Sequence, residues 1–357
     1  MRQLDGLRAL CVAAVAWSHW GPTVGFDLKY FPGAEFGVET FFVISGFLIT
    51  GILLDHRSQE LRPQVLQQFY IRRCLRIFPV FYLVLAVALL LQTFGMRQTW
   101  LWHASYLSNI YFYLHGWFGE LSHFWSLAVE EQFYLFWPLF IFMMPRRFMF
   151  SAISLIILSA PVYAVYMTAQ HPGPSRVTSS VLMPSCLSAL GIGALLACAV
   201  RDRIDARKFM RGLLLLGTVG IAAWFFYGAP VWLKPCERLA EDFLFGWLVF
   251  TVANGVRGPV GWFLSCTPMN YLGKISYGIY IIHNFARPLV ASGLAALKYP
   301  KWLTELYNSP WISIPLLAGI TIGLASLSWH LYEKPINNLK RFFPYPSAAK
   351  REDKIQV

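Results

Sequence analysis

The sequence predicts an all-α fold, a polytopic bundle of about ten transmembrane helices with both termini in the cytoplasm. The 357 residues are 57% hydrophobic and 13% charged, about half the charge of an average soluble domain, and the mean hydropathy is +0.49. Apolar runs long enough to cross a bilayer recur along the chain. The basic residues gather in the loops on one side of these runs.

Ten apolar segments approach the length of ~20 residues that crosses a hydrocarbon core of ~30 Å. We place them at 4–20, 37–54, 77–94, 124–144, 149–169, 182–200, 210–228, 237–254, 273–293 and 311–331. The aromatic stretch 100–113 forms an interfacial or an additional segment. We expect residues 1–335 to form the transmembrane domain and residues 336–357 a basic cytoplasmic tail, without an appended soluble domain.

The Lys and Arg residues sort sharply between the two sides that ten spans define. Of the 30, 22 lie on the side of the termini and seven on the other, while Arg287 falls within a helix. Because basic loops stay in the cytoplasm, this asymmetry orients both termini inwards. It also explains the net charge of +12 without a nucleic-acid partner. The six cysteines lack metal or disulfide spacing, so we expect no metal site.

The first segment carries three ionisable side chains into an otherwise apolar helix. Arg8 and His19 are eleven residues apart, so at about 100° per residue they share one face, and Asp5 falls within ~40° of it. Each such group costs at least ~2.5 kcal/mol to insert, so this face indicates a functional site. The alternative is an Arg8 that reaches the interface and a packed, neutral His19.

Three arginines, Arg72, Arg73 and Arg76, precede the third apolar run. On a helix, Arg73 and Arg76 project from one face at the cytoplasmic mouth of the span. Paired guanidinium groups favour an anionic ligand of the phosphate type, because each can bond two oxygens at once. The alternative is a basic anchor that contacts lipid phosphates.

The fourth span carries two adjacent acids, Glu130 and Glu131. It runs inwards from the outer surface, which places Glu130 roughly 10 Å below that surface, at a depth similar to that of His19. A carboxylate beside an imidazole fixes its tautomer and raises its basicity, as a general base requires. Adjacent side chains point about 100° apart, so only one can face His19. The alternative is a buried Glu130 satisfied by polar neighbours.

Two more spans carry polar residues within apolar runs. Ser45 and Gly46 form a small pair, which favours close contact with another helix. Ser276 and His283 are seven residues apart and share one face of a later span. His283 falls in the middle of the membrane, where a packing role and a functional role are equally open.

Together these stretches resemble the acyltransferase 3 family of integral membrane acyltransferases. Five blocks in the family's order carry the resemblance: Leu4-Asp5-Gly6-Leu7-Arg8 with His19, residues 37–49, Arg73 with Arg76, residues 125–134 and residues 275–283. The resemblance implies about ten spans and transfer of an acyl group, commonly acetyl, from acyl-CoA to a sugar hydroxyl of a glycan. It also implies catalytic roles for Arg8 and His19, donor binding by Arg73 and Arg76, and the stand-alone type of the family.

We therefore expect donor phosphates to bind Arg73, Arg76 and Arg72, with the pantetheine arm reaching His19. Neutral His19, oriented by Glu130, would deprotonate a hydroxyl of a glycan or lipid-linked sugar. Arg8 would line the donor channel or pair with Asp5. Candidates for substrate or oxyanion contacts are Ser45, Glu131, Tyr277 and His283. A covalent acyl-histidine is the rival mechanism.

We expect a multi-pass protein of the plasma (inner) membrane that contacts membrane lipids. Acetyl-CoA or another acyl-CoA would be its co-substrate, and no cofactor would stay bound. The competing class is a proton-coupled secondary transporter, which would use the same intramembrane His, Glu and Arg residues as a proton relay. The sequence shows no visible internal repeat of the kind that transporters contain, which favours the enzyme.

Overall fold

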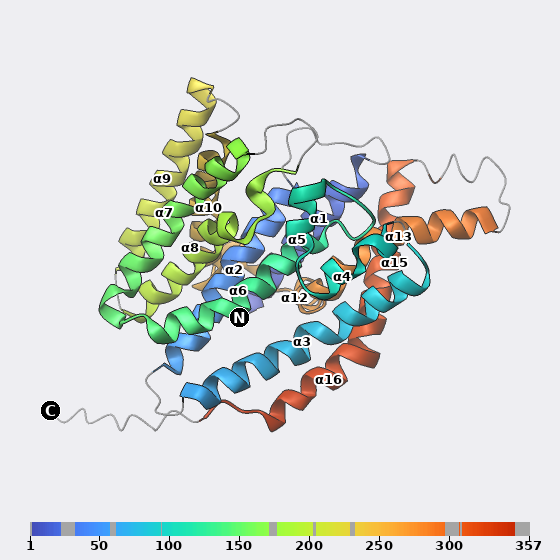
Figure 1. The fold of residues 1–357 in the computed structure, drawn as a ribbon, viewed down its shortest axis with the longest axis horizontal. Coiled ribbons are helices and arrows are strands. Elements are labelled where there is room, and N and C mark those ends of the chain that lie inside the picture. The colour runs from blue at the N-terminus through green and yellow to red at the C-terminus, as the bar shows by residue number, and fades with distance from the viewer. Residues whose placement is uncertain are drawn as a thin grey trace.

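A computed structural model describes residues 2–22, 33–57, 62–93, 95–170, 177–202, 205–228, 233–296, 307 and 309–346. Within these ranges the chain is helical and forms no strand (Figure 1), which confirms the predicted all-α class. The α-helices are α1 (Arg2–Trp20), α2 (Gly33–Asp55), α3 (Arg62–Leu90), α4 (Met96–Ala104), α5 (Ser108–His115), α6 (Phe124–Met143), α7 (Arg146–Gln170), α8 (Met183–Arg201), α9 (Ala206–Tyr227), α10 (Lys234–Ala253), α11 (Gly258–Ser265), α12 (Thr267–Lys274), α13 (Ser276–Ala296), α15 (Pro310–Ser328) and α16 (Lys334–Asn338). Shorter turns are η2 (Ser179–Val181), η4 (Trp329–Glu333) and η5 (Leu339–Phe342), of which η4 is π-helical.

Every predicted span overlaps a helix, but fewer helices meet the length and apolar composition that a membrane crossing needs. In the described part of the chain, six helices do so, and α10 with α11, bent by 81°, would be a seventh. The six are Gly33–Asp55, Pro63–Leu90, Arg146–Gln170, Met183–Arg201, Lys208–Tyr227 and Pro310–Phe342. Helices α1, α6 and α13 form where spans were predicted but are not among these six.

Helix α3 differs from its predicted span, because it starts at Arg62 rather than at residue 77. Its first half is rich in Arg, Gln and Leu, which are good helix formers even where the segment is not apolar. The three arginines therefore lie inside a long helix, rather than in front of it. The aromatic stretch 100–113 folds as parts of two short helices, α4 and α5.

The helices divide into two groups, with α1 and α2 between them (Figure 1). Helices α7, α8, α9 and α10 pack together on one side, and α13 packs against α15 on the other. Helix α1 lies between them and contacts α2, α10, α11, α12 and α13. Helix α6 packs against α2 and α5 instead, so α2 stands between the helix that carries His19 and the helix that carries Glu130.

Close packing of α2 against α8 fixes the position of α2. A Cβ atom on Gly46 would lie 1.9 Å from the carbonyl oxygen of Leu190, and one on Gly193 would lie 2.0 Å from that of Val43. Because only glycine permits such an approach, the two backbones are in direct contact. The predicted close helix contact at Ser45 and Gly46 is confirmed.

Candidate functional site

Two cavities lie next to each other between the central helices. The arginine cavity has a volume of about 90 Å³ and is lined by Arg8, Ser45, Arg73, Arg76, Glu130, Tyr277 and others. The histidine cavity has a volume of about 490 Å³ and is lined by His19, Glu35, Trp117, His123, Trp125, Glu241 and others. Val38 and Tyr280 line both cavities, and both side chains are buried. These two residues therefore form part of a wall between the cavities.

Three histidines from three helices meet beside the histidine cavity. The ring centroid of His283 lies 4.9 Å from that of His19 and 4.7 Å from that of His123. His283 and His123 are buried, and His19 is partly exposed. Nε2 of His283 is 3.3 Å from Nδ1 of His19. Within the described ranges, no group of three or more His, Cys, Asp or Glu residues could hold a metal ion, so the cluster is organised by hydrogen bonds.

Backbone carbonyls determine which nitrogen of each ring carries the proton. A carbonyl oxygen only accepts, so the ring nitrogen that faces it must donate. Nδ1 of His19 faces the carbonyl of Val15 at 2.9 Å, and Nδ1 of His283 faces that of Tyr280 at 2.6 Å. His283 therefore presents an unprotonated Nε2 to the Nδ1–H of His19. The network leaves Nε2 of His19 as an unprotonated acceptor, which is the state of a general base.

His123 was not among the residues singled out from the sequence, although it lies two residues before the block 125–134 that contains Glu130. Its Nε2 donates to the carbonyl of Ile281 at 3.3 Å, and its Nδ1 accepts from the side-chain amide of Asn284 at 3.0 Å. The ring therefore sits neutral between α6 and α13. Its position at the start of a helix beside an apolar run is the only signal that the sequence offered.

Glu130 lies in the arginine cavity and does not contact His19. Its Oε1 accepts a hydrogen bond from Ser45 at 2.6 Å, and Ser45 in turn accepts from the hydroxyl of Tyr134 at 3.1 Å. The structure thus places Glu130 across from α2 rather than beside the imidazole. The expected orientation of His19 by a carboxylate is supplied instead by Val15 and His283.

The arginine cavity gathers three guanidinium groups. Arg8 pairs with Asp5, with Nη1 3.7 Å from Oδ1, and this is one of the two arrangements that we expected for it. The guanidinium of Arg73 lies 5.7 Å from the centroids of the Phe69 and Tyr134 rings. Among the described residues, neither Arg73 nor Arg76 makes an ion pair. Arginines without a carboxylate partner in a concave site are suited to a phosphate ligand.

Arg72 turns away from this cavity towards the end of the chain. Its Nη1 donates to the carbonyl oxygens of Lys340 at 3.0 Å and of Phe343 at 3.1 Å. Its guanidinium also lies 5.1 Å from the centroid of the Tyr345 ring. These contacts occupy the group that we expected to assist Arg73 and Arg76, so Arg72 anchors the C-terminal segment in this arrangement.

The remaining candidates occupy different positions. Tyr277 lines the arginine cavity and donates its hydroxyl hydrogen to the carbonyl of Ile77 at 3.1 Å, and Ser276 lines the same cavity. Glu131 is outside the residues that line either cavity, and its Oε1 has no hydrogen-bond partner among the described residues. Tyr280, which sequence reasoning did not single out, contacts Ser126 through its hydroxyl at 2.5 Å.

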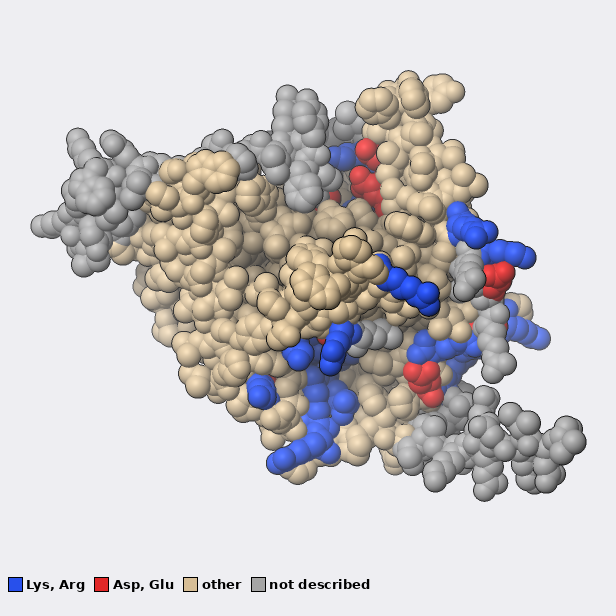
Figure 2. Space-filling view, turned by 180° about the vertical axis from the view of Figure 1, so that it is seen from behind, with Lys and Arg blue, Asp and Glu red and all other residues tan. Residues whose placement is uncertain are grey.

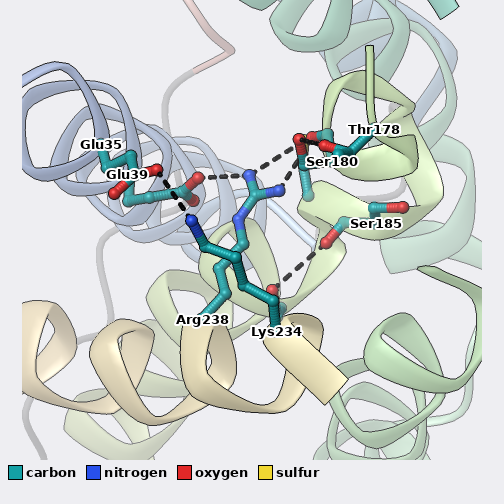
Figure 3. A network of polar contacts seen from close by, with 9 residues as sticks. Glu35, Glu39, Thr178, Ser180, Ser185, Lys234 and Arg238 are labelled. Carbon is teal, nitrogen blue, oxygen red and sulfur yellow. Dashed lines mark hydrogen bonds and ion pairs between the residues drawn. The ribbon is translucent and has the colours of Figure 1, made fainter. Parts of the chain in front are cut away.

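Charged and hydroxyl side chains close the end of the histidine cavity that is formed by α2 and α10 (Figure 3). Arg238 pairs with Glu39 and donates to the carbonyl of Ser180 at 2.8 Å, while Nζ of Lys234 lies 3.8 Å from Glu35. Seen from behind, the molecule shows acidic side chains in a hollow at one end and a concentration of basic side chains at the other (Figure 2). A concave surface lined by aromatic side chains and a few polar groups is typical of a small-molecule site.

The fold and the two cavities define a multi-pass membrane protein with a buried histidine cluster beside an arginine-lined cavity. The chain belongs to the acyltransferase 3 family, because the model of that family's acyltransferase domain matches residues 1–330. The predicted family is thereby confirmed.

Two curated relatives illustrate the similarity. Peptidoglycan O-acetyltransferase OatA of Listeria monocytogenes is 30% identical over 369 residues, which cover 93% of this chain and 55% of that protein. O-acetyltransferase OatA of Staphylococcus aureus is 30% identical over 315 residues, which cover 78% of this chain and 49% of that protein. The chain spans about half the length of these relatives. No solved structure matches it significantly.

Proposed function

We propose that this chain is a membrane O-acetyltransferase that moves an acetyl group from cytoplasmic acetyl-CoA to a hydroxyl of a cell-wall glycan. One observation carries the proposal: Val15 holds the Nδ1 proton of His19, so Nε2 is free to accept a proton on a ring that lines the histidine cavity. The names of the two relatives support acetyl as the group and peptidoglycan as the acceptor. The arginine cavity supports a donor that carries phosphates.

The proposed reaction uses both cavities. The glycan hydroxyl binds in the histidine cavity, and Nε2 of His19 takes its proton as the oxygen attacks the thioester carbonyl carbon. The tetrahedral intermediate then breaks its carbon–sulfur bond, and the departing thiolate takes the proton from His19. The products are the acetyl ester and free CoA thiol. Glu130 belongs to the donor side in this scheme and supports the cavity through Ser45.

The oxyanion of the intermediate needs a hydrogen-bond donor. The hydroxyls of Ser45 and Tyr277 already donate, to Glu130 and to the carbonyl of Ile77. Nδ1 of His283 donates to a carbonyl as well. The hydroxyl of Tyr280 also donates, to the carbonyl of His123 at 3.1 Å, and it contacts Ser126. We assign the role to Tyr280 because, unlike Ser45 and Tyr277, it lines both cavities.

We retain the prediction of about ten spans, both termini in the cytoplasm and residence in the plasma membrane. The charge asymmetry between loops supports this orientation, and it places the donor site on the cytoplasmic side. Reporter domains fused after residues 57, 145 and 202 test it, since all three loops should lie in the cytoplasm. An external signal from the loop after residue 145 would contradict the orientation.

Purified protein in proteoliposomes tests the activity directly. Acetyl-CoA is supplied with a panel of glycans and lipid-linked sugars, and both free thiol and acetylated product are measured. We expect thiol release that depends on one class of acceptor, with the His19→Ala protein as the inactive control. Movement of a solute without thiol release would identify a transporter, and thiol release without an acetylated sugar would exclude the proposed acceptor class.

A further inference from the structure

The end of the described chain folds back along the helix that carries the three arginines. After α15 the chain continues through η4, α16 and η5, and both α16 and η5 contact α3 (Figure 1). We call residues 334–346 the C-terminal segment. Arg72 holds it through the carbonyls of Lys340 and Phe343. The Tyr345 ring also lies 4.5 Å from the imidazole of His56, at the end of α2. The segment is therefore fixed to α3 through Arg72 and to the end of α2 through His56.

Lys340 is a half-buried cation in this segment and has no ion-pair partner among the described residues. Its ammonium makes no ion pair and no hydrogen bond to any described residue. The charged groups that act on it are Arg76, Arg73 and Arg72, in decreasing order, and all are positive. A lysine with no function would extend into water, as the neighbouring exposed Arg341 does. Lys340 instead stays half-buried where the charged groups that act on it are guanidinium groups, which repel it.

This arrangement suits an anionic ligand. Carboxylates act on two of the arginines, Glu130 on Arg73 and Glu333 on Arg76, but none is among the charged groups that act on Lys340. Repulsion between the four partly buried cations is relieved when a polyanion binds among them. Phosphate groups fit best, since the guanidinium forks of Arg73 and Arg76 bind two oxygens each and an ammonium adds a point charge. Two phosphate sources could reach this position: the nucleotide part of the donor and the headgroup of an anionic lipid.

We propose that Lys340 is a further phosphate ligand of the donor site, which the C-terminal segment completes beside Arg73 and Arg76. This inference rests on the proposed acetyl-CoA donor. Arg72 acts in it as a positioning residue, because its guanidinium is used to hold the segment. The lysine binds the part of the donor that lies outside the arginine cavity, which it does not line itself.

Direct binding of CoA tests the assignment without requiring turnover. The full chain is placed in nanodiscs of phosphatidylcholine, and the dissociation constants of CoA, dephospho-CoA and pantetheine are measured. We expect Lys340→Met to weaken CoA binding about tenfold, which is ~1.4 kcal/mol, and to leave pantetheine binding unchanged. Lys340→Arg should restore most of the affinity because it keeps the charge. The exposed neighbour provides the matched control, so Arg341→Met should bind CoA as the wild type does.

The other outcomes separate the explanations. Equal affinity of wild type and Lys340→Met for CoA overturns the inference, as does equal weakening for CoA and pantetheine. If Lys340→Met alters only the response to added phosphatidylglycerol, the ligand is a lipid headgroup and the donor assignment is wrong. Wild-type protein that binds CoA but transfers no acetyl group contradicts the proposed function and leaves the Lys340 comparison intact. Arg72→Ala should repeat the Lys340→Met result, since it releases the segment.

Discussion

Nε2 of His283 lies 3.3 Å from Nδ1 of His19, although 264 residues separate the two in the sequence. Helix α13 thereby completes a hydrogen-bond network that begins at the carbonyl of Val15, one turn before His19 on its own helix. The contact holds the first imidazole in one tautomer without a carboxylate. The imidazole of a histidine in a membrane segment can thus be oriented without burying an additional charged group.

The first prediction concerns this base. His19→Ala should lower kcat by about 10²–10⁴-fold, the usual contribution of a general base, while expression and CoA affinity stay unchanged. The control is His115→Ala, since His115 is exposed and its Nδ1 contacts only its own helix, at the carbonyl of Tyr111. Acetyl transfer by reconstituted protein is the measurement. Turnover of the His19 variant within tenfold of wild type would remove His19 from the mechanism.

The second prediction separates the two positions considered for Glu130. If its carboxylate raised the basicity of His19, Glu130→Gln would shift the acidic limb of the kcat/KM profile to lower pH. Because Glu130 contacts Ser45 instead, we expect a fall in rate with an unmoved limb. Profiles from pH 5 to 9 measure this. Glu131→Gln should leave both rate and profile unchanged, since that side chain lines neither cavity.

The third prediction tests donor binding in the arginine cavity. Arg76→Ala should raise KM for acetyl-CoA and leave KM for the glycan alone, because only the donor carries the phosphates. Arg76→Lys should rescue in part, since a point charge cannot reproduce the bidentate fork. The loss should shrink for acetyl-pantetheine. Equal weakening for both donors would return Arg73 and Arg76 to the role of a basic membrane anchor.

The fourth prediction concerns the wall between the cavities. Tyr280→Phe removes the hydroxyl that contacts Ser126 and retains the ring. We expect kcat to fall by about 10²–10³-fold with little change in either KM, as for the loss of one oxyanion donor. Tyr111→Phe is the matched control, because the Tyr111 ring packs against Trp102 and His115 while its hydroxyl makes no hydrogen bond to a described residue. A fall in donor or acceptor affinity without a change in kcat would give Tyr280 a structural role only.

The fifth prediction concerns the contact between α2 and α8. Gly46→Ala places a Cβ within 1.9 Å of a backbone oxygen of Leu190, and such overpacking costs ~1–3 kcal/mol. Thermal unfolding in detergent should show a lower Tm. Gly212→Ala introduces the same methyl group into α9 with nothing within 4 Å, so its Tm should equal that of wild type or exceed it. Equal Tm values for both variants would mean that the two helices can separate.

The periodicity of α1 was sufficient to predict much of the site. Asp5 and Arg8 pair as the spacing suggested. Arg8 lines the arginine cavity and His19 the histidine cavity, as expected of two residues on one face at different heights. The partners of His19 could not be predicted, because a sequence does not reveal which helices are neighbours. His123 and His283 come from α6 and α13, and only the packing around α1 brings them together.

The position of Glu130 shows where linear reasoning stops. The predicted depths of Glu130 and His19 follow from the rise per residue of upright helices, and the prediction also requires that the two side chains face each other. Depth alone does not define rotation about the helix axis, and α6 presents Glu130 to α2, from which Ser45 extends. Arg72 deviates for a related reason, since its partners are backbone carbonyls near the end of the chain. Backbone groups carry no sequence signature.

The wall that Val38 and Tyr280 form between the cavities also matters for the energetics of the living cell. A water-filled passage across the bilayer would let protons and ions run down the membrane potential, at about 2.3 kcal/mol per charge for every 100 mV. In the proposed reaction only an acetyl group would cross this barrier, and that group is small and uncharged. The voltage does no work on such a group, so an enzyme of this design could modify sugars outside the cell without discharging the membrane that powers it.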